Sequence, residues 1–154
     1  MVDNEHIIED LRGLAVEIDQ LTLDPANARL HNDRNMRAIE TSLKRFGQRK
    51  PIVVQKQGMV VRAGNGTLTA ARNLGWETVA AVVIEEDNLD AVSFAIADNR
   101  TGDLSDWDYN TLGDLLTELN DAGDQDLSGL GWTKEELDTF VAENVMDFEI
   151  PNDG

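Results

Sequence analysis

The sequence predicts an α/β (α+β) fold, a small mixed sheet with packed helices, followed by a helical acidic C-terminal extension. Short β-branched segments alternate with segments of helical periodicity over residues 16–102, which is typical of mixed α/β domains. The length of 154 residues allows one compact domain of common size with additional segments. Residues 103–154 carry fifteen acidic residues and one basic residue, so the character of the chain changes there.

The first half of the predicted domain contains a strand, a helix and a hairpin. Residues 16–23 form an imperfectly alternating apolar segment, which predicts a short strand. Residues 36–46 carry apolar side chains at the spacing of an amphipathic helix, and Gly47 is a natural helix stop. Residues 51–62 contain two β-branched runs on either side of Gln57-Gly58, which predicts a hairpin.

The second half of the predicted domain contains two helices with a strand between them. Residues 67–74 predict a helix that ends at Gly75. Residues 78–84 form an apolar, β-branched run, which predicts a strand buried on both faces. Residues 90–99 have the composition of a helix.

Beyond residue 102 the sequence predicts further helices. Residues 110–122 place four leucines on one helical stripe: Leu112, Leu115, Leu116 and Leu119. Thr133 and Glu136 form a capping box that opens another helix, whose apolar residues are Leu137, Phe140 and Val141. The predicted parts are therefore an acidic lead, the domain, the acidic extension and a flexible tail: residues 1–15, 16–102, 103–145 and 146–154.

The net charge of −17 is unevenly distributed along the chain. Residues 25–76 hold ten basic residues against two acidic ones, a net charge of +8, whereas residues 103–154 have a net charge of −14. A basic segment between acidic ones predicts a local anion site rather than a broad nucleic-acid face, and the alternative is a solvated basic surface. The acidic segment either covers the basic one in the same chain or docks on a basic protein partner.

Composition excludes several classes of protein. The sequence contains no cysteine, which excludes a disulfide framework, a thiolate metal site and a cysteine nucleophile. The first ten residues are polar and no run approaches 18 apolar residues, so we expect a cytoplasmic protein without a membrane partner. His6 and His31 lie far apart without a carboxylate cluster at metal spacing, so we expect no metal site and an exposed loop position for His31.

The most informative local feature is a strand–turn–helix at residues 60–72. Gly64 and Gly66 allow a positive φ and a close approach of the backbone, and the following helix presents unpaired N–H groups. Together these form a cradle suited to phosphate, and nearby side chains can add donors and charge: Asn65, Thr67, Thr69, Arg62 and Arg72. No P-loop lysine follows, and the dinucleotide fingerprint fails at position 69. The alternative is a plain strand-to-helix corner.

The order of these segments resembles the ParB/sulfiredoxin superfamily over about residues 16–102. The resemblance rests on these blocks: Asn27-Ala28-Arg29, Phe46-Gly47, Lys50-Pro51-Ile52-Val53-Val54, Ala63 to Gly75, and Thr78 to Val83. The chain is most similar to phage ParB-like nuclease-domain proteins and to ParB-like domains fused to DNA methylases. Those relatives continue with segments similar to two others in this chain: Ala97-Asp98-Asn99-Arg100-Thr101 and Asp106-Trp107-Asp108.

The resemblance implies a nucleotide or phosphate site. Gly64 to Thr67 lie where ParB proteins have a Gly-Glu-Arg-Arg box that binds CTP phosphates and sulfiredoxins have a Gly-Cys-His-Arg box that binds ATP. Arg29 matches the arginine of an Asn-Pro-Arg segment that can reach phosphate, and Lys50 lies just before the family's proline. The implied cofactor is CTP or ATP with Mg²⁺.

Three departures from the family pattern narrow the expected function. Thr67 stands where the family usually has arginine, which weakens phosphate binding. No cysteine occupies the box, so sulfinic-acid reduction is excluded. No basic helix-turn-helix domain follows, so we do not expect sequence-specific binding to a partition site.

Three other groups of residues have more than one interpretation. One helical turn carries an acceptor, an amide and a guanidinium, which form either a secondary binding site or a structural cap: Asp98, Asn99 and Arg100. Three alternating acids lack the glycine and glutamate of an EF-hand, and we expect a solvated or partner-facing surface: Asp103, Asp106 and Asp108. The three tryptophans are expected to anchor cores rather than stack on bases: Trp76, Trp107 and Trp132.

The sequence therefore predicts a ParB-like nucleotide- or phosphate-binding protein in DNA maintenance or modification of a bacteriophage or other mobile element. The expected partners are a nucleotide and DNA along residues 25–76, and a homodimer is compatible with the sequence. Triphosphate hydrolysis stays open, because no residue stands out as a general base. The alternative from another class is a non-enzymatic acidic module or nucleic-acid mimic, and a DNase is a smaller alternative.

Overall fold

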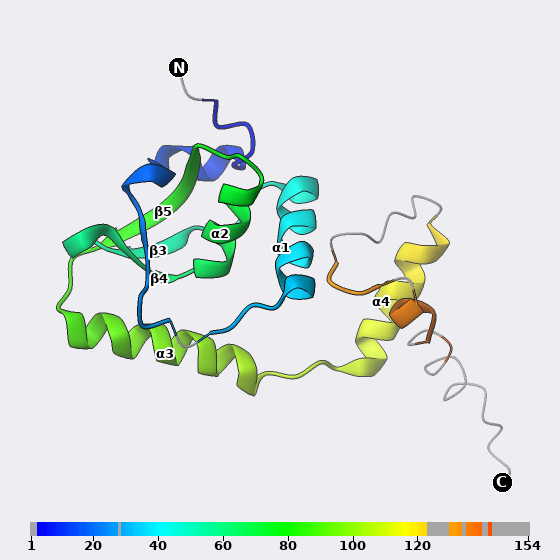
Figure 1. Ribbon diagram of the computed structural model, residues 1–154. Helices are drawn as coiled ribbons and strands as arrows, with labels where there is room; N and C mark the ends of the chain where they lie inside the picture. Colours follow the sequence, from blue (N-terminus) through cyan, green and yellow to red (C-terminus); the bar gives the residue numbers. More distant parts are fainter. Residues whose placement is uncertain (1–2, 28, 123–129, 134, 140–141, 143–154) are drawn as a thin grey trace, which may run out of the picture.

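A five-stranded mixed sheet forms the centre of the protein, with helices packed around it (Figure 1). The computed structural model describes residues 3–27, 29–122, 130–133, 135–139 and 142. The strands are β1 (Ala15–Glu17), β2 (Thr22–Leu23), β3 (Ile52–Gln55), β4 (Val60–Ala63) and β5 (Thr78–Ile84). The helices are α1 (Asp33–Phe46), α2 (Asn65–Asn73), α3 (Asn88–Leu104) and α4 (Tyr109–Asp121). The predicted mixed α/β class is confirmed.

The strands lie in the order β1-β5-β3-β4-β2. The two outer pairs differ, because β1 is antiparallel to β5 whereas β2 is parallel to β4. In the centre, β3 is parallel to β5 and antiparallel to β4. Helix α2 packs on the sheet, α1 packs on α2, and α3 runs past β4 (Figure 1). No helix in the described part of the chain is long and apolar enough to cross a lipid bilayer.

The prediction of one strand over residues 16–23 is wrong, because the segment breaks into two strands at opposite edges of the sheet. Val16 pairs with Val79 on β5, and Leu23 pairs with Val61 on β4. A 3₁₀ turn over Ile18–Gln20 separates the two strands. Apolar residues 16, 18, 21 and 23 are spaced by two, three and two, and the gap of three matches one 3₁₀ turn.

The hairpin and the first helix are confirmed. β3 and β4 pair antiparallel, and a short 3₁₀ turn over Gln57–Met59 connects them. Helix α1 begins at Asp33 rather than at residue 36, because the Asn32 side chain accepts a hydrogen bond from the Asn35 N–H and caps it. It ends at Gly47, as expected, where φ is +71°.

The turn between β4 and α2 consists of Gly64 alone. Its φ is +100°, and a Cβ placed there would lie 2.4 Å from Cγ2 of Ile52. Helix α2 therefore begins at Asn65, two residues before the predicted start. Gly66 lies inside the helix and is not among the glycines of positive φ, so the expectation that both glycines supply a positive φ is wrong.

Strand β5 is buried over only part of its length, which corrects the prediction of burial on both faces. Its residues Thr78 to Ala81 are buried, whereas Val82, Val83 and Ile84 are 37–41% exposed. This exposed end lies beyond the short neighbour β1, which pairs only with residues 78–80 of β5.

The tryptophans differ in how far they anchor a core. Trp76 packs against the main core and lies 4.4 Å, centroid to centroid, from the ring of His6. Trp132 packs against a second cluster of Leu112, Leu116 and Leu137. Trp107 is 55% exposed, and its ring lies 5.3 Å, centroid to centroid, from that of Trp132, so the expectation of a core anchor is wrong there.

The acidic extension packs around that second cluster. Leu112 and Leu116 of α4 are buried but Leu115 and Leu119 are exposed, so only half of the predicted leucine stripe faces a core. Helix α3 runs to Leu104 and therefore crosses the predicted boundary at residue 102. Phe140, Val141 and the predicted tail over residues 146–154 lie outside the described residues.

The predicted capping box is confirmed, and an arginine of α1 reinforces it. The Thr133 N–H donates to Glu136 (2.9 Å), and the Glu136 N–H donates to the Thr133 hydroxyl (3.1 Å). Arg34 forms an ion pair with the same Glu136 carboxylate. The Arg34 guanidinium, and then the Thr133 N–H, hold the pKa of Glu136 at about 2, below its usual value of 4.5.

We predict that Gly64→Ala destabilises the fold by about 2–4 kcal/mol, because it adds left-handed strain and a clash with Ile52. Denaturant unfolding measures the change. The control is Gly102→Ala in α3, where nothing lies within 4 Å of an added Cβ and alanine favours the helix. Unchanged stability of Gly64→Ala would contradict the described turn.

We predict a pH-dependent effect of Glu136→Gln. A carboxyl whose pKa is depressed on folding stabilises the protein above its unfolded pKa and loses that contribution as the pH falls through its folded pKa. The stability difference between parent and Glu136→Gln should therefore shrink steadily as the pH falls from 4.5 towards 2. Urea unfolding followed by tryptophan fluorescence measures it, with Glu135→Gln as the control. A difference that is independent of pH would contradict the Arg34–Glu136 contact.

Candidate functional site

A pocket of about 280 Å³ lies at the start of α2. The loop before α1 forms one wall, the β4–α2 turn forms the floor, and the second half of α3 forms the other wall. The pocket brings together eight of the residues predicted from the sequence: Arg29, Arg62, Gly64, Asn65, Gly66, Thr67, Asp98 and Asn99.

The floor of this pocket is the amino-terminal end of α2. The N-cap Gly64 has no capping side chain, and its carbonyl accepts the first helical hydrogen bond, from the Leu68 N–H (2.9 Å). No carbonyl of the helix is available to the backbone N–H groups of residues 65–67. All three residues line the pocket, so unpaired donors and the positive end of the helix dipole coincide there. This arrangement can bind an anion.

His31 covers part of the floor, which corrects its expected place as an exposed loop residue. It is half-buried, lines the pocket and hydrogen-bonds with the Asn35 side chain. A Cβ on Gly66 would lie 2.7 Å from its Cε1 atom. The imidazole therefore packs directly on the bare backbone of Gly66.

Arg29 lies on the wall formed by the loop before α1. Asp103 is the next residue after Gly102, which lines the second wall from α3. The Nη1 atom of Arg29 lies 2.6 Å from Oδ1 of Asp103, and the two side chains are 44% and 50% exposed. An anion that binds Arg29 must therefore compete with this carboxylate. Asn27, which sequence reasoning left out of the site, accepts a hydrogen bond from the Arg29 N–H (3.1 Å). The Asn-x-Arg spacing, typical of an Asx turn, is a signal that could have found it.

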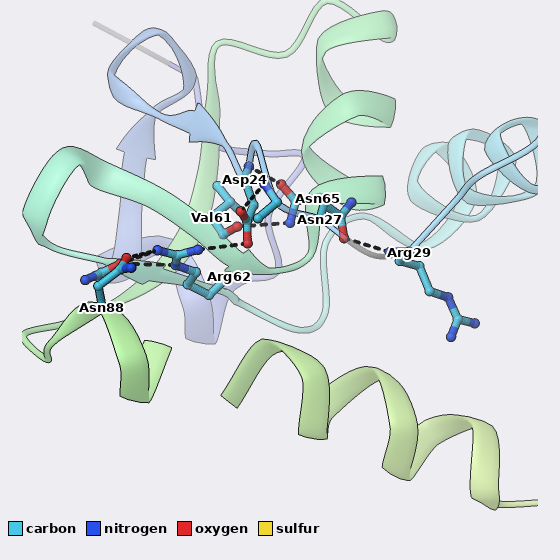
Figure 2. Close-up of polar contacts among 9 residues, drawn as sticks. Asp24, Asn27, Arg29, Val61, Arg62, Asn65 and Asn88 are labelled. Atoms are coloured by element: carbon cyan, nitrogen blue, oxygen red, sulfur yellow. Dashed lines mark hydrogen bonds and ion pairs between the residues drawn. The ribbon is translucent and has the colours of Figure 1, made fainter. Parts of the chain in front are cut away.

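Two predicted donors use their side chains inside the protein. The Asn65 amide accepts from the Asp24 N–H and donates to the Val61 carbonyl, each at 2.9 Å. The Arg62 guanidinium is buried against Asp24 and hydrogen-bonds with two other residues, as Figure 2 shows. The backbone N–H of Asn65, in the first turn of α2, stays available to a ligand.

Four other predicted site residues lie outside the pocket. Thr69 donates its hydroxyl to the Asn65 carbonyl (3.0 Å), and Arg72 donates to the Leu21 carbonyl (3.1 Å). Arg100 is exposed on α3 and does not line the pocket. Lys50 lines a neighbouring hollow of about 520 Å³, which is separated from the first pocket by the shared residues Ile39 and Thr67.

The acidic residues beyond α3 have structural contacts. The Asp108 carboxylate caps α4 by accepting from the Thr111 N–H, and this hydrogen bond lowers the pKa of Asp108. Asp106 accepts from the Trp107 N–H (2.7 Å). Over the described ranges no group of three or more histidine, aspartate or glutamate side chains is placed to hold a metal ion.

Comparison with known proteins gives one curated relative and solved structures of the same fold. No protein-family model matches the sequence. The chain is 28% identical over 76 residues to the ParB-like nuclease domain-containing protein YnaK of Escherichia coli strain K12, a match that covers 49% of this chain and 86% of the relative.

The structure is similar to the C-terminally truncated chromosome-partitioning protein ParB from Caulobacter crescentus, solved in complex with CTP-γ-S. The TM-score is 0.72 at 19% sequence identity, and the match covers 82% of this chain and 75% of the other. The relative and the shared fold agree with the resemblance carried by the glycine turn and the segments around it. Together, the sequence match and the shared fold support a ParB-like superfamily assignment.

Proposed function

We propose that the chain binds a nucleoside triphosphate, with the phosphate groups at the start of α2. The observation that carries this proposal is one pocket that is lined both by residues 65–67, with the unpaired N–H groups at the start of α2, and by Arg29. A helix amino terminus is suited to one phosphate group, and a guanidinium can bind a second through parallel hydrogen bonds. A polyphosphate uses both features, whereas a single small anion uses one.

The neighbouring hollow supports a nucleotide rather than inorganic polyphosphate. Ile39 and Thr67 border both spaces, and the hollow is lined by five residues of α1, including Leu43 and Phe46, and by residues 47–50 that follow the helix. Apolar side chains of this kind can accept a base and a sugar next to a phosphate site. CTP is the first candidate, because the similar ParB structure contains CTP-γ-S. ATP is the second, and Mg²⁺ accompanies either.

The proposal includes a role in DNA maintenance or modification of a phage or other mobile element. It rests on the resemblance to ParB-like proteins and on the net charge of +8 over residues 25–76. Two arginines of that segment, Arg29 and Arg34, pair with Asp103 and Glu136 of the acidic extension. These contacts favour an extension that covers the basic segment of its own chain over one that docks on a basic protein partner.

Thermal unfolding with a panel of nucleotides tests the proposed function. CTP, ATP, GTP and the deoxynucleoside triphosphates are each added with Mg²⁺, and one of them should raise the melting temperature. A ligand at a hundred times its Kd stabilises the folded state by about 2.7 kcal/mol. If none of these nucleotides raises the melting temperature, the proposed function is wrong.

We predict that Gly66→Val abolishes binding of that nucleotide while the protein stays folded. The added side chain would occupy the place of the His31 ring and cover the N–H groups on the floor. Isothermal titration measures the affinity. The matched control is Gly13→Val, because an added Cβ at Gly13 meets nothing within 4 Å and this residue does not line the pocket. Unchanged affinity in folded Gly66→Val would place the ligand elsewhere.

We predict that Arg29→Ala weakens binding of the triphosphate more than binding of the monophosphate, by about tenfold or more for the triphosphate. A charged hydrogen bond contributes about 1.5–3 kcal/mol, and only the longer ligand can reach both the helix and the guanidinium. Titration with both nucleotides measures the ratio. Arg37→Ala, an exposed arginine on α1, is the control. Equal losses for the two ligands would make Arg29 a structural residue.

A further inference from the structure

We propose that Arg62 is a positioning residue, which holds both walls of the pocket in place and does not bind the phosphate groups itself. The inference rests on the proposed function and assigns this arginine a task different from the one the sequence predicts. Its side chain is 6% exposed, and that of its partner Asp24 is 4% exposed. A buried ion pair of this kind needs further hydrogen bonds to offset the loss of water.

The donors of Arg62 are almost fully used within the protein. Its Nη1 donates to Asp24 (3.0 Å), its Nε and Nη2 donate to Gln55 (3.1 and 2.7 Å), and Nη2 also donates to Asn88 (2.8 Å). A guanidinium has five N–H groups, so a single one is left for a ligand. Asp24 also neutralises the positive charge, which reduces its attraction for phosphate.

Through Asp24, Arg62 acts on the first wall of the pocket. The Asp24 carboxylate also accepts from the Ala26 N–H (2.8 Å), and the Asp24 carbonyl accepts from the Asn27 N–H (3.1 Å). Asn27 in turn accepts from the Arg29 N–H (3.1 Å). In Figure 2 these residues form a continuous path, and the Arg29 side chain points away from Arg62. Arg62 in β4 therefore fixes the loop that carries Arg29.

Through Asn88, Arg62 acts on the second wall. Asn88 is the first residue of α3, and the pocket is lined by residues 98, 99 and 102 of the same helix. Ala91 is the one residue of α3 that is buried, so apolar packing holds this helix weakly. Gln55, which is bonded to Arg62, also donates to the Glu86 carbonyl (3.1 Å) just before α3. The hydrogen bonds of Arg62 therefore anchor the start of this helix.

A planar guanidinium is suited to this task. It points donors in fixed directions towards a loop, a strand and a helix at once, whereas a lysine ammonium is a compact charge without that fork. Walls that are held before the ligand arrives reduce the ordering cost of binding. The expected effect of Arg62 is therefore on affinity, transmitted through its neighbours.

Two variants of those neighbours separate positioning from direct contact. Asp24→Asn keeps an acceptor for the Ala26 N–H but removes the countercharge of Arg62. If Arg62 acts through Asp24, this variant loses affinity for the ligand. If Arg62 binds phosphate directly, the released guanidinium gains affinity. Asn88→Ala removes an exposed side-chain amide, and with it the hydrogen bond between Arg62 and α3. This variant therefore still tests the proposal if Asp24→Asn does not fold.

The experiment is titration of the full chain with inorganic tripolyphosphate, which probes the phosphate site without a base. It is combined with hydrogen exchange of the ligand-free protein. We expect three- to tenfold weaker binding in both variants, faster exchange over residues 26–31 in Asp24→Asn, and faster exchange over residues 88–92 in Asn88→Ala. Ser93→Ala, an exposed position on α3, is the control and should match the parent.

Equal or tighter binding in Asp24→Asn overturns the proposal, as does unchanged binding in Asn88→Ala. A parent protein that does not bind tripolyphosphate, CTP or ATP contradicts the proposed function instead. In that case the exchange rates still decide whether the Arg62 network holds the two walls. Unchanged hydrogen exchange in both variants would show that the Arg62 network does not hold the two walls, and would overturn the proposal as well.

Discussion

The turn at Gly64 is the constraint on which the rest of the site depends. Strand β4 ends at Ala63 and helix α2 begins at Asn65, so one residue must reverse the direction of the chain. Only a residue without a Cβ meets both demands there, a φ of +100° and close packing against Ile52. The result is a helix whose first N–H groups open directly into a pocket. Arg29, His31 and Asp98 line the same pocket as this helix end.

The local features of this site could be predicted from the sequence, because they depend on short spacings. The hairpin, the end of α1 at Gly47, the glycine turn and the Thr133–Glu136 box are all encoded within a few residues. The break at Ile18–Gln20 was missed, since a spacing of three between buried residues fits both an irregular strand and a 3₁₀ turn. The sequence therefore predicts which elements form better than it predicts the residues at which they begin and end.

The long-range contacts could not be predicted in the same way. Asp24 and Arg62 are 38 residues apart, and no periodicity connects them. As a result the sequence predicts Arg62 and Asn65 as free donors, although their side chains form hydrogen bonds inside the protein. Similarly, the separate charges of residues 25–76 and 103–154 suggested attraction, but the structure was needed to identify the pairs Arg29–Asp103 and Arg34–Glu136.

The most direct test of the central claim is an amide NMR titration of the full chain with CTP and Mg²⁺, repeated with ATP. A phosphate site at the start of α2 predicts that the largest chemical-shift changes occur at the N–H groups of Asn65, Gly66 and Thr67, because these groups would donate to the phosphates. The backbone N–H of Arg29 should show the next largest change, because the guanidinium of this residue would bind the phosphates. Changes that are absent for both nucleotides, or that leave these three amides unaffected, would contradict it.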